Sequence, residues 1–196
     1  LKDSEFRLMS RTMPKLERIQ RFARRVIKDN GLNARVDVTL DRREALKDAD
    51  YVIAMLQVGG VDAFQMDYEI PLKHGVDQCI GDTLGPGGVF RALRSIPVMV
   101  DLARDVRELC PKAHVLNYVN PMAPVCWALG TVPGVSFIGL CHGVQGTLRH
   151  LCSFIEVPYS EVSALYFGMN HLTWITHFTR DGEDLWPLVD AKLASD

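Results

Sequence analysis

The chain has 196 residues, of which 47% are hydrophobic and 23% charged, enough for one sizeable domain or for one domain and part of a second. A formal net charge of −2 favours neither nucleic acid nor an anionic membrane as a partner. The cysteine count of five is odd and includes no CxxC pair, which predicts free thiols and a cytoplasmic protein. No apolar run approaches the roughly 18 residues of a membrane span.

The first third of the chain alternates strand-like and helix-like patterns. The expected elements are strands at 6–9, 36–40 and 51–56 and helices at 12–30 and 42–48. Nearly continuous apolar strands joined by helices predict a parallel sheet that is covered on both faces. The sequence opens with Leu1 in the middle of this pattern, so we expect it to be an internal fragment.

The same alternation continues until the character of the strands changes near residue 160. The expected elements are a helix and turn over 62–75 interrupted by Pro71, a helix at 89–110, a strand at 114–119, a helix at 122–129, a strand at 136–140 and a helix at 144–155. Residues 162–168 and 173–179 have the β-branched and aromatic content of an antiparallel pair. We therefore predict an α/β, Rossmann-like dinucleotide-binding domain at 1–158 and the start of a second α+β domain at 159–196.

Cys141 and His171 are the residues best suited to hold a metal. Cys141 follows a predicted parallel strand, at the edge of the sheet where ligands bind in open α/β folds. A thiolate and an imidazole from two segments can hold one divalent cation and leave the open positions that a catalytic metal needs. The structural alternative is that Cys141 is a small buried hydrophobe and His171 a hydrogen-bonded core histidine.

Four segments, taken together, resemble a known family. They are residues 82–88 (DTLGPGG), 117–122 (NYVNPM), 141–147 (CHGVQGT) and 168–171 (GMNH). In this order and spacing they are similar to the NAD- and manganese-dependent glycoside hydrolases of family 4, and most similar to the α-galactosidase branch. The resemblance covers almost the whole chain. It implies a lactate/malate dehydrogenase-like fold whose first strand and glycine-rich loop would precede residue 1, since no such loop occurs in the sequence.

The resemblance also assigns roles to individual residues. It implies that Cys141 and His171 bind Mn²⁺ and that Asn120 contacts substrate near the nicotinamide of NAD. His142 stands where some members carry an aspartate that is the proposed proton donor, and imidazole can serve as a general acid near neutral pH. Asp82 matches an acidic position that adjusts the base or the second coordination shell of the metal.

The cofactor residues implied by the resemblance lie at strand ends. Gly59 and Gly60 would pass close to NAD, together with Asn117 and Asn120, although both asparagines can instead satisfy backbone groups where a strand ends. Ser10-Arg11 follows the strand at 6–9, which matches the family's second strand, and after that strand the family usually has an acidic residue for the adenosine ribose. A hydroxyl followed by a guanidinium suits a 2′-phosphate, so we keep NADP as a hypothesis.

The family mechanism implies a small-molecule α-galactoside as substrate and a homo-oligomer, either a dimer or a tetramer. The sugar is oxidised at C3, the C2 proton becomes acidic, the C1 leaving group is eliminated, water adds and the hydride returns. The general base of the family, a tyrosine or aspartate, would lie beyond residue 196. We therefore expect the 196-residue chain to be inactive by itself.

Three other readings remain open at this stage. A malate- or lactate-type dehydrogenase shares the α/β plan, but it needs a substrate-binding arginine and an Asp–His pair that have no convincing counterpart here. The same family also contains α-glucosidases and α-galacturonidases, and recognition of the sugar C4 hydroxyl is not readable from sequence. The last reading is a non-catalytic nucleotide-binding or interaction module.

Overall fold

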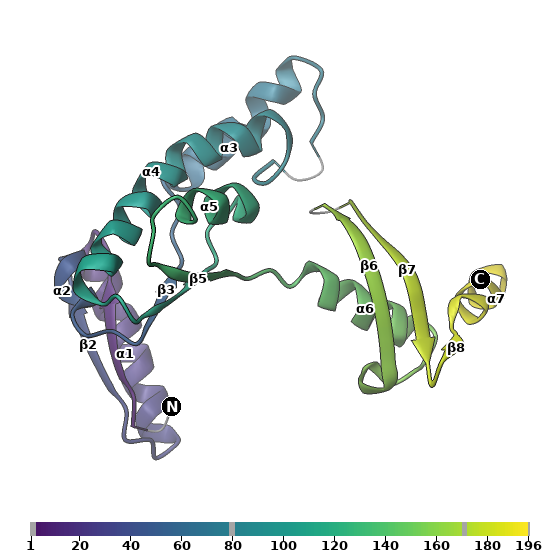
Figure 1. Ribbon diagram of the computed structural model, residues 1–196, viewed down its shortest axis with the longest axis horizontal. Coiled ribbons are helices and arrows are strands. Elements are labelled where there is room, and N and C mark those ends of the chain that lie inside the picture. Colours follow the sequence, from purple (N-terminus) through teal and green to yellow (C-terminus); the bar gives the residue numbers. More distant parts are fainter. Residues whose placement is uncertain (1–2, 79–80, 170–171, 196) are drawn as a thin grey trace.

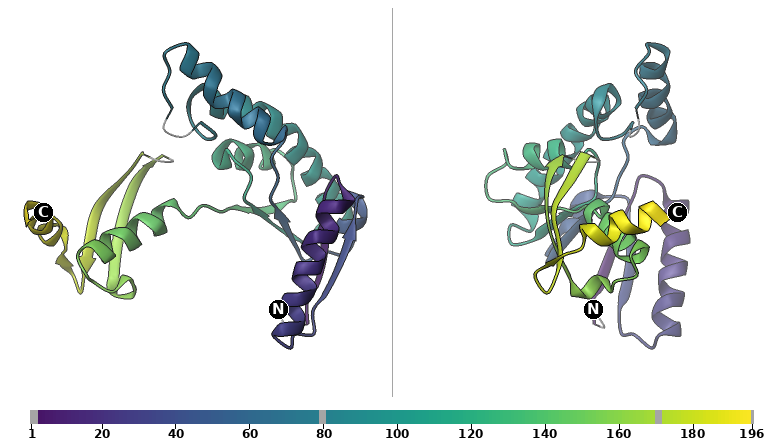
Figure 2. Two further views of the ribbon diagram at one scale, coloured as in Figure 1. Left: turned by 180° about the vertical axis from the view of Figure 1, so that it is seen from behind. Right: turned by 90° about the vertical axis from the view of Figure 1, so that its right-hand side faces the viewer.

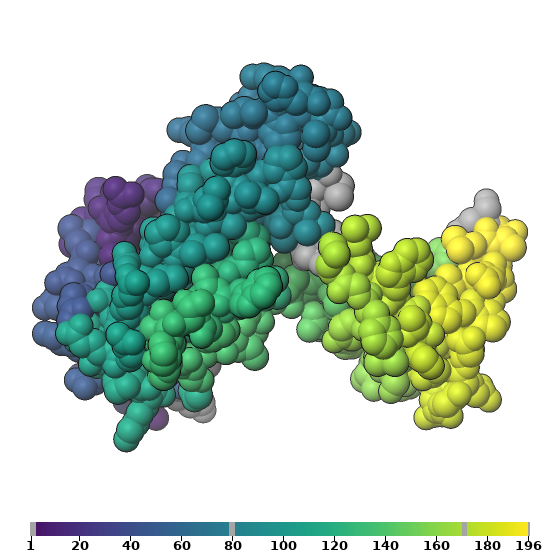
Figure 3. All heavy atoms as spheres, turned by 45° about the horizontal axis from the view of Figure 1, so that its top comes forward, coloured from purple at the N-terminus to yellow at the C-terminus, as the bar shows by residue number. Residues whose placement is uncertain are grey.

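The computed structural model describes residues 3–78, 81–169 and 172–195, which form two lobes joined by an extended segment between β5 and α6 (Figure 1). The first lobe contains the parallel strands and the long helix α4. The second contains α6, an antiparallel ribbon and the C-terminal helix. Figure 3 shows the two lobes as separate masses with a narrow connection.

The strands of the first lobe all pair in parallel. They are β1 (Glu5–Met9), β2 (Arg35–Thr39), β3 (Tyr51–Ala54), β4 (His114–Asn117) and β5 (Ser136–Gly139). β1 pairs with β2, and β4 lies between β3 and β5, so that two small parallel sheets result. Within the described residues, the second edge of β1 and the second edge of β3 pair with no strand. The predicted parallel α/β architecture is confirmed.

Helices pack on these strands as the apolar periodicity predicts. They are α1 (Met13–Asp29), α2 (Arg42–Leu46), α3 (Gly60–Lys73), α4 (Gly85–Leu109) and α5 (Met122–Leu129). The main core forms where α4 and α5 cover β3 and β4, with Met99, Val115 and Val125 fully buried. The opposite face of this sheet is open, and Ile53 and Ile138 are more than half exposed on it.

α3 differs from the sequence expectation, because it runs through Pro71 and ends at Lys73 rather than breaking there. Proline in a helix leaves the carbonyl four residues earlier without its usual donor. That carbonyl belongs to Asp67, and the side-chain amide of Gln78 donates to it over 3.0 Å. The buried Asp67 carboxylate also pairs with Arg94, which joins α3 to α4. A substitute donor and an ion pair therefore hold the last turn of α3.

The second lobe begins with α6 (Gly143–Phe154) and continues through a short 3₁₀ turn, η1 (Tyr159–Glu161). Its ribbon consists of β6 (Val162–Met169), β7 (Leu172–Arg180) and β8 (Glu183–Asp184), followed by α7 (Trp186–Ser195). The β6–β7 pairing is antiparallel with an irregularity between Leu165 and Tyr166. The predicted antiparallel pair is confirmed. The end of the ribbon at which β6 stops and β7 starts is directed towards the first lobe (Figures 1 and 2).

α6 packs with the second lobe, although the sequence division assigns it to the first domain. Leu148 and Cys152 of α6 are buried against Phe178, Leu185 and Val189. An amphipathic helix reveals which of its faces is apolar but not which neighbour covers that face, so the predicted domain division at residue 158 stays a prediction. In the described part of the chain, no helix combines the length and the apolar character needed to cross a membrane.

Candidate functional site

A cavity of about 940 Å³ lies between β1 and β3, runs along the whole of β3 and reaches the carboxyl ends of both strands. Ser10 and Arg11 line it directly after β1, and Gly59 and Gly60 line it after β3. The fold therefore brings together four of the residues predicted for the cofactor, although almost fifty positions separate the two pairs in the sequence. Ligands in open parallel sheets bind at this edge.

The Gly59-Gly60 turn requires glycine for its backbone conformation. Gly59 has φ +81° and Gly60 has φ +65°, values in the left-handed region where side chains are strained. A Cβ on Gly59 would stand 2.5 Å from the Cβ of Ala63 in the first turn of α3. Gly59 is the N-cap of α3, and both glycines line the cavity at the start of that helix.

A second set of predicted residues meets around one carboxylate. The Asn120 Nδ2 donates to Asp82 Oδ2 over 3.0 Å, and the Thr83 hydroxyl donates to Asp82 Oδ1 over 2.9 Å. The Arg91 guanidinium lies 3.2 Å from the same Asp82 Oδ2. We call Asp82, Arg91 and Asn120 the polar triad. The prediction names two of its members, and the structure adds the third.

Gln57 connects the polar triad to the cavity. Its Nε2 donates to the backbone carbonyl of Gly60 over 2.9 Å, and its Oε1 accepts from Arg91 Nη2 over 3.4 Å. Gln57 itself lines the cavity. The predicted cofactor segment and the predicted substrate residues are therefore neighbours in one continuous polar network at the carboxyl edge of the strands.

The glycines of the 82–88 segment explain how Asp82 is placed. A Cβ on Gly88 would stand 2.5 Å from the backbone carbon of Thr83, and one on Gly87 would collide with backbone oxygens of Gly81 and Asp67. Only glycine lets the loop that carries Asp82 lie directly on the first turn of α4. The helix also begins at Gly85, four residues before the expected start, so these glycines are helical rather than a preceding turn.

Asn117 has a structural position. Its side chain is 0% exposed, donates from Nδ2 to the Val119 carbonyl and accepts the Val119 backbone N–H over 3.0 Å. These two bonds satisfy the backbone where β4 ends, which is the structural alternative considered for this residue. The Asn117 side chain does not line the cavity. The predicted contact of Asn117 with NAD stays a prediction.

Cys141 and His142 lie beyond β5 at the same edge of the sheet. The backbone N–H of Leu140 bonds to the Asn117 carbonyl over 2.9 Å, so the chain leaves β5 beside the end of β4. Cys141 is exposed, and its sulfur accepts a 3.5 Å hydrogen bond from the Gly143 N–H. His142 is also exposed and is the N-cap of α6. Both side chains are open to a ligand.

The second predicted metal ligand, His171, lies outside the described residues. Across 3–78, 81–169 and 172–195, no three His, Cys, Asp or Glu side chains gather in a way that would hold a metal ion. The structure therefore leaves the pairing of Cys141 with His171 as a prediction. It does place the exposed Cys141 two residues after β5, in the segment that joins the two lobes.

Arg91 is the residue of this site that sequence reasoning missed. It lies in α4, its side chain is 9% exposed, and its Nε donates to the backbone carbonyl of Asn120 over 3.3 Å. Its guanidinium also lies 5.8 Å from the centre of the Phe64 ring. A buried arginine surrounded by partners from three loops is unusual, but these partners are 9 to 34 positions away in sequence. No local motif marks it.

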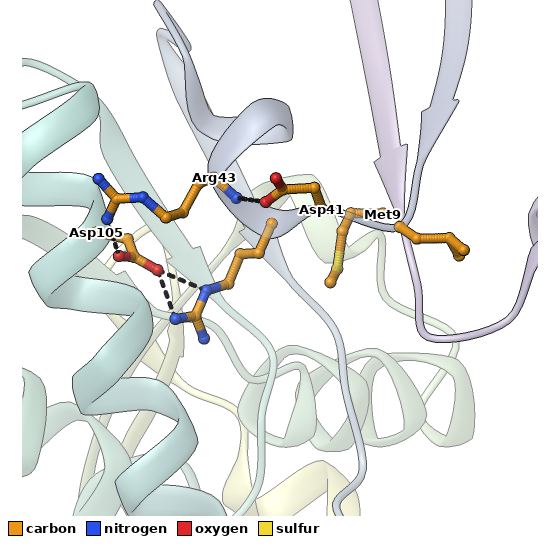
Figure 4. A pocket seen from close by; sticks show the side chains of 6 residues that line it. Met9, Asp41, Arg43 and Asp105 are labelled. Carbon is orange, nitrogen blue, oxygen red and sulfur yellow. Dashed lines mark hydrogen bonds and ion pairs between the residues drawn. The ribbon is translucent and has the colours of Figure 1, made fainter.

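A second polar hollow, of about 630 Å³, lies at the other end of α4 beside α2. Figure 4 shows Asp105 held there by two guanidiniums, with Met9 and Asp41 close by. The guanidiniums belong to Arg42 and Arg43, which bond to the two Asp105 oxygens at 2.7 and 2.5 Å. Since these charges satisfy one another, the group serves to attach α2 to α4.

Sequence profiles of one family match both lobes. The profile described as "Family 4 glycosyl hydrolase" covers residues 1–157, and the profile of its C-terminal domain covers residues 166–196. A curated alpha-galactosidase of Rhizobium meliloti (strain 1021) is 40% identical over 183 residues, which is 93% of this chain and 37% of that protein. The chain therefore spans little more than a third of such a relative.

Other curated relatives carry different names. An alpha-galacturonidase of Bacillus subtilis (strain 168) is 39% identical over 154 residues, covering 74% of this chain and 34% of that protein. A 6-phospho-beta-glucosidase of Escherichia coli (strain K12) is 40% identical over 173 residues, covering 87% and 38%. Identity alone therefore does not separate the substrates named within the family.

Solved structures agree with the profiles. A 6-phospho-alpha-glucosidase from gut microorganisms, solved with NAD and Mn²⁺, matches with a TM-score of 0.86 at 27% identity, covering 98% of this chain and 44% of that one. Malate dehydrogenase from Plasmodium falciparum matches at 0.65 with 14% identity, covering 96% and 54%, a likeness that shows the fold alone. With its cavity, its polar triad and two profiles that together account for nearly all its residues, the chain belongs to the family 4 glycosyl hydrolases.

Proposed function

We propose that the intact protein is an NAD- and Mn²⁺-dependent α-galactosidase. The observation that carries this proposal is the shared edge of the sheet. There, the cavity lined by Ser10, Arg11 and Gly59 adjoins the polar triad, and the exposed Cys141 thiol follows the neighbouring strand. The 40% identical relative named an alpha-galactosidase supports the choice of sugar.

The carboxyl-end part of the cavity suits the phosphates of a dinucleotide. Gly59 and Gly60 border it with backbone that carries no side chains, and Arg11 supplies a positive charge. The N-terminus of α3 follows directly, and helix N-termini favour anionic groups such as a pyrophosphate. In this arrangement Ser10 and Arg11 would bind the adenosine end, and the Gly59-Gly60 turn would lie along the cofactor.

The Cys141 thiol suits a divalent metal, because it is exposed and only one weak N–H···S contact occupies it. Thiolate and imidazole ligands prefer Zn²⁺ over Mn²⁺ on softness alone, so the choice of Mn²⁺ rests on the relatives. We propose His171 as the second ligand. The 6-phospho-alpha-glucosidase structure that was solved with NAD and Mn²⁺ supports the presence of both groups.

When bound, NAD would accept and return a hydride at the sugar C3, and the metal would polarise the C2 and C3 oxygens. The residues of this chain orient the sugar and move protons around that chemistry. Asn120, held by Asp82, would bond to a substrate hydroxyl. His142, exposed beside Cys141, would donate a proton to the departing C1 oxygen. The general base would come from a segment outside residues 1–196.

The test is hydrolysis of p-nitrophenyl α-galactoside by the full-length protein. We expect release of p-nitrophenol that requires NAD⁺, Mn²⁺ and a thiol reductant and that stops when EDTA is added. A glycosidase that uses two carboxylates would need neither cofactor nor metal. Release that persists after both have been removed would contradict the proposal, and so would oxidation of malate or lactate in place of glycoside cleavage.

Substrate and cofactor preference need matched comparisons in the same assay. We expect the α-galactoside to be cleaved faster than the α-glucoside, the α-galacturonide and the 6-phosphoglucosides. NADP⁺ remains a hypothesis that rests on the Ser10-Arg11 pair, and an Arg11→Ala variant should then lose NADP⁺-supported activity more than NAD⁺-supported activity. A clear NAD⁺ preference in the unmodified protein would remove that hypothesis.

Location and assembly are also proposals. Cys110, Cys126, Cys141 and Cys152 are all free, which supports a reducing, cytoplasmic compartment. We propose a homo-oligomer, either a dimer or a tetramer. Light scattering of the full-length protein tests the assembly, and a monomer at micromolar concentration would contradict it. We propose no nucleic-acid or membrane partner.

A further inference from the structure

Hydrogen-bond chemistry determines which way the side chain of Asn120 faces. A carboxylate accepts hydrogen bonds and donates none, so the group of Asn120 that contacts Asp82 Oδ2 at 3.0 Å is its NH₂. The amide oxygen of Asn120 must then point away from Asp82. Among the described residues this oxygen accepts no hydrogen bond, and the side chain is partly exposed. Asn120 therefore presents an acceptor to whatever occupies the site.

Arg91 holds both groups that define this orientation. Its Nη1 lies 3.2 Å from the Asp82 oxygen that also accepts from Asn120, and its Nε bonds to the Asn120 backbone carbonyl over 3.3 Å. One guanidinium therefore fixes the carboxylate and the backbone of the residue that the carboxylate orients. Gln57 and the Phe64 ring also contact the guanidinium.

We propose that Arg91 is a positioning residue that keeps the Asn120 amide oxygen directed at a hydroxyl group of the substrate. This inference rests on the proposed function, in which Asn120 contacts the sugar. Arg91 is buried behind Asp82 and Asn120 and acts through them, with no contact of its own to the substrate.

These contacts require the several separate N–H donors of a guanidinium and not only a positive charge. Three different nitrogens of Arg91 contact three partners, the Asp82 carboxylate, the Asn120 carbonyl and the Gln57 amide oxygen. A lysine ammonium is a single point with one centre for all its donors. Arg91→Lys would retain the pair with Asp82 but lose the simultaneous bonds, and Arg91→Met would lose all of them.

The kinetic test uses full-length protein with p-nitrophenyl α-galactoside. Loss of one well-oriented hydrogen bond to substrate is worth about tenfold in binding. We expect Arg91→Met to raise KM about tenfold with a smaller change in kcat, because ground-state binding is lost. We expect Arg91→Lys to recover part of this loss. Arg104→Met, which removes an exposed Asp101 pair on the same helix, is the matched control and should leave both constants unchanged.

A readout that does not need activity separates this inference from the proposed function. In full-length protein labelled with ¹⁵N at asparagine, we expect Arg91→Met and Asp82→Asn each to shift the side-chain amide resonances of Asn120, and Arg104→Met to leave them in place. Arg91→Lys and the isosteric Asp82→Asn keep the test available if the Met variant does not fold.

Three results decide the matter. Unchanged Asn120 resonances in Arg91→Met, or an unchanged KM in an active Arg91→Met enzyme, overturn the positioning role. Shifted resonances in a protein that cleaves no glycoside retain the orientation and reject the proposed function. A fall in kcat alone, with no change in KM, also overturns the inference, because it would place Arg91 in the chemical step.

Discussion

The two ends of α4 carry similar ion pairs that serve different purposes. Near its first turns, Arg91 pairs with Asp82 beside Asn120 and Gln57, three residues that loops supply. Near its last turns, Asp105 pairs with Arg42 and Arg43 of the adjacent helix. The first group borders the cavity through Gln57, whereas the second joins two helices and satisfies its own charges.

The difference shows that burial of a charge does not by itself mark a functional site. Arg91 and Asp105 are equally buried, each with 8% of its surface exposed. The two groups differ in whether a partner keeps a free hydrogen-bonding atom. In the group around Arg91, the Asn120 amide oxygen is such an atom. A functional network leaves one polar group available to a ligand, whereas a structural network uses its groups internally.

The largest expected effect is on activity at the first end. Asp82→Ala should lower kcat/KM for the α-galactoside about a hundredfold in full-length protein, because Asn120 loses its orientation and Arg91 loses its counter-charge. Steady-state kinetics, together with a thermal melt to show that the variant is folded, provide the measurement. A wild-type kcat/KM in Asp82→Ala would show that the ion pair at the start of α4 is structural, like the one at its end.

A change with no charge should have the next largest effect. Gly88→Ala introduces a Cβ 2.5 Å from the Thr83 backbone and must displace the loop that carries Asp82. We expect kcat/KM to fall about tenfold, since a misplaced Asp82 orients Asn120 poorly. Gly146→Ala is the matched control, because a Cβ there meets no atom within 4 Å. Equal activity of the two variants would show that the close approach at Gly88 has no functional role.

The second end should respond in stability only. Asp105→Ala leaves Arg42 and Arg43 without their shared partner, and both arginines are about a third or more exposed. Water therefore screens part of the loss, and we expect the free energy of unfolding to fall by about 1 kcal/mol. Urea unfolding of the full-length protein measures this. The kcat/KM of folded full-length variant should not change, and a loss there would contradict the structural role.

The smallest effect concerns alkaline pH at the residue that ends α4. Burial raises the pKa of the Cys110 thiol above its ordinary value of 9.0, the backbone bond to Ala49 opposes this, and Asp48 adds to it. Because the folded pKa is raised, the stabilising contribution is present below pH 9.0 and is lost as pH rises through the folded pKa.

We therefore expect the unfolding free energy of the chain to decrease between pH 8 and pH 10, with a shallower decrease in Cys110→Ala. Cys126 and Cys152 also have raised pKa values through burial, so part of the slope remains in that variant. Identical slopes in the two proteins would show that Cys110 ionises without cost.

Apolar periodicity predicts most of the elements, because burial on one face fixes both strand and helix patterns. The strands β1 to β5 and the ribbon of β6 and β7 appear where the sequence places them. The deviations at Pro71 and Gly85 arise from contacts that sequence spacing does not contain. At Pro71 the side chain of Gln78 supplies a donor, and in the first turn of α4 the absence of side chains at Gly87 and Gly88 lets a loop lie on the helix.

The site is less predictable than the fold, for a physical reason. Asp82 and Asn120 stand within recognisable motifs, and the structure joins them directly. Arg91 belongs to no motif, since its role depends on three loops that converge only after folding. Asn117 is the reverse case, because it belongs to a motif but its side-chain amide bonds to the backbone at the end of its own strand. Motif membership and chemical availability are therefore separate properties.

The unpaired edges of β1 and β3 have a consequence for handling this polypeptide. Each edge offers a row of unused backbone donors and acceptors to any extended chain that approaches it. The exposed side chains of Tyr51 and Ile53 on β3 add an apolar surface beside these unpaired backbone groups. In concentrated solution the 196-residue chain should therefore self-associate, because strands of one molecule can pair with these edges of another. Low protein concentration, low temperature and charged substitutions at the two edges should limit this association.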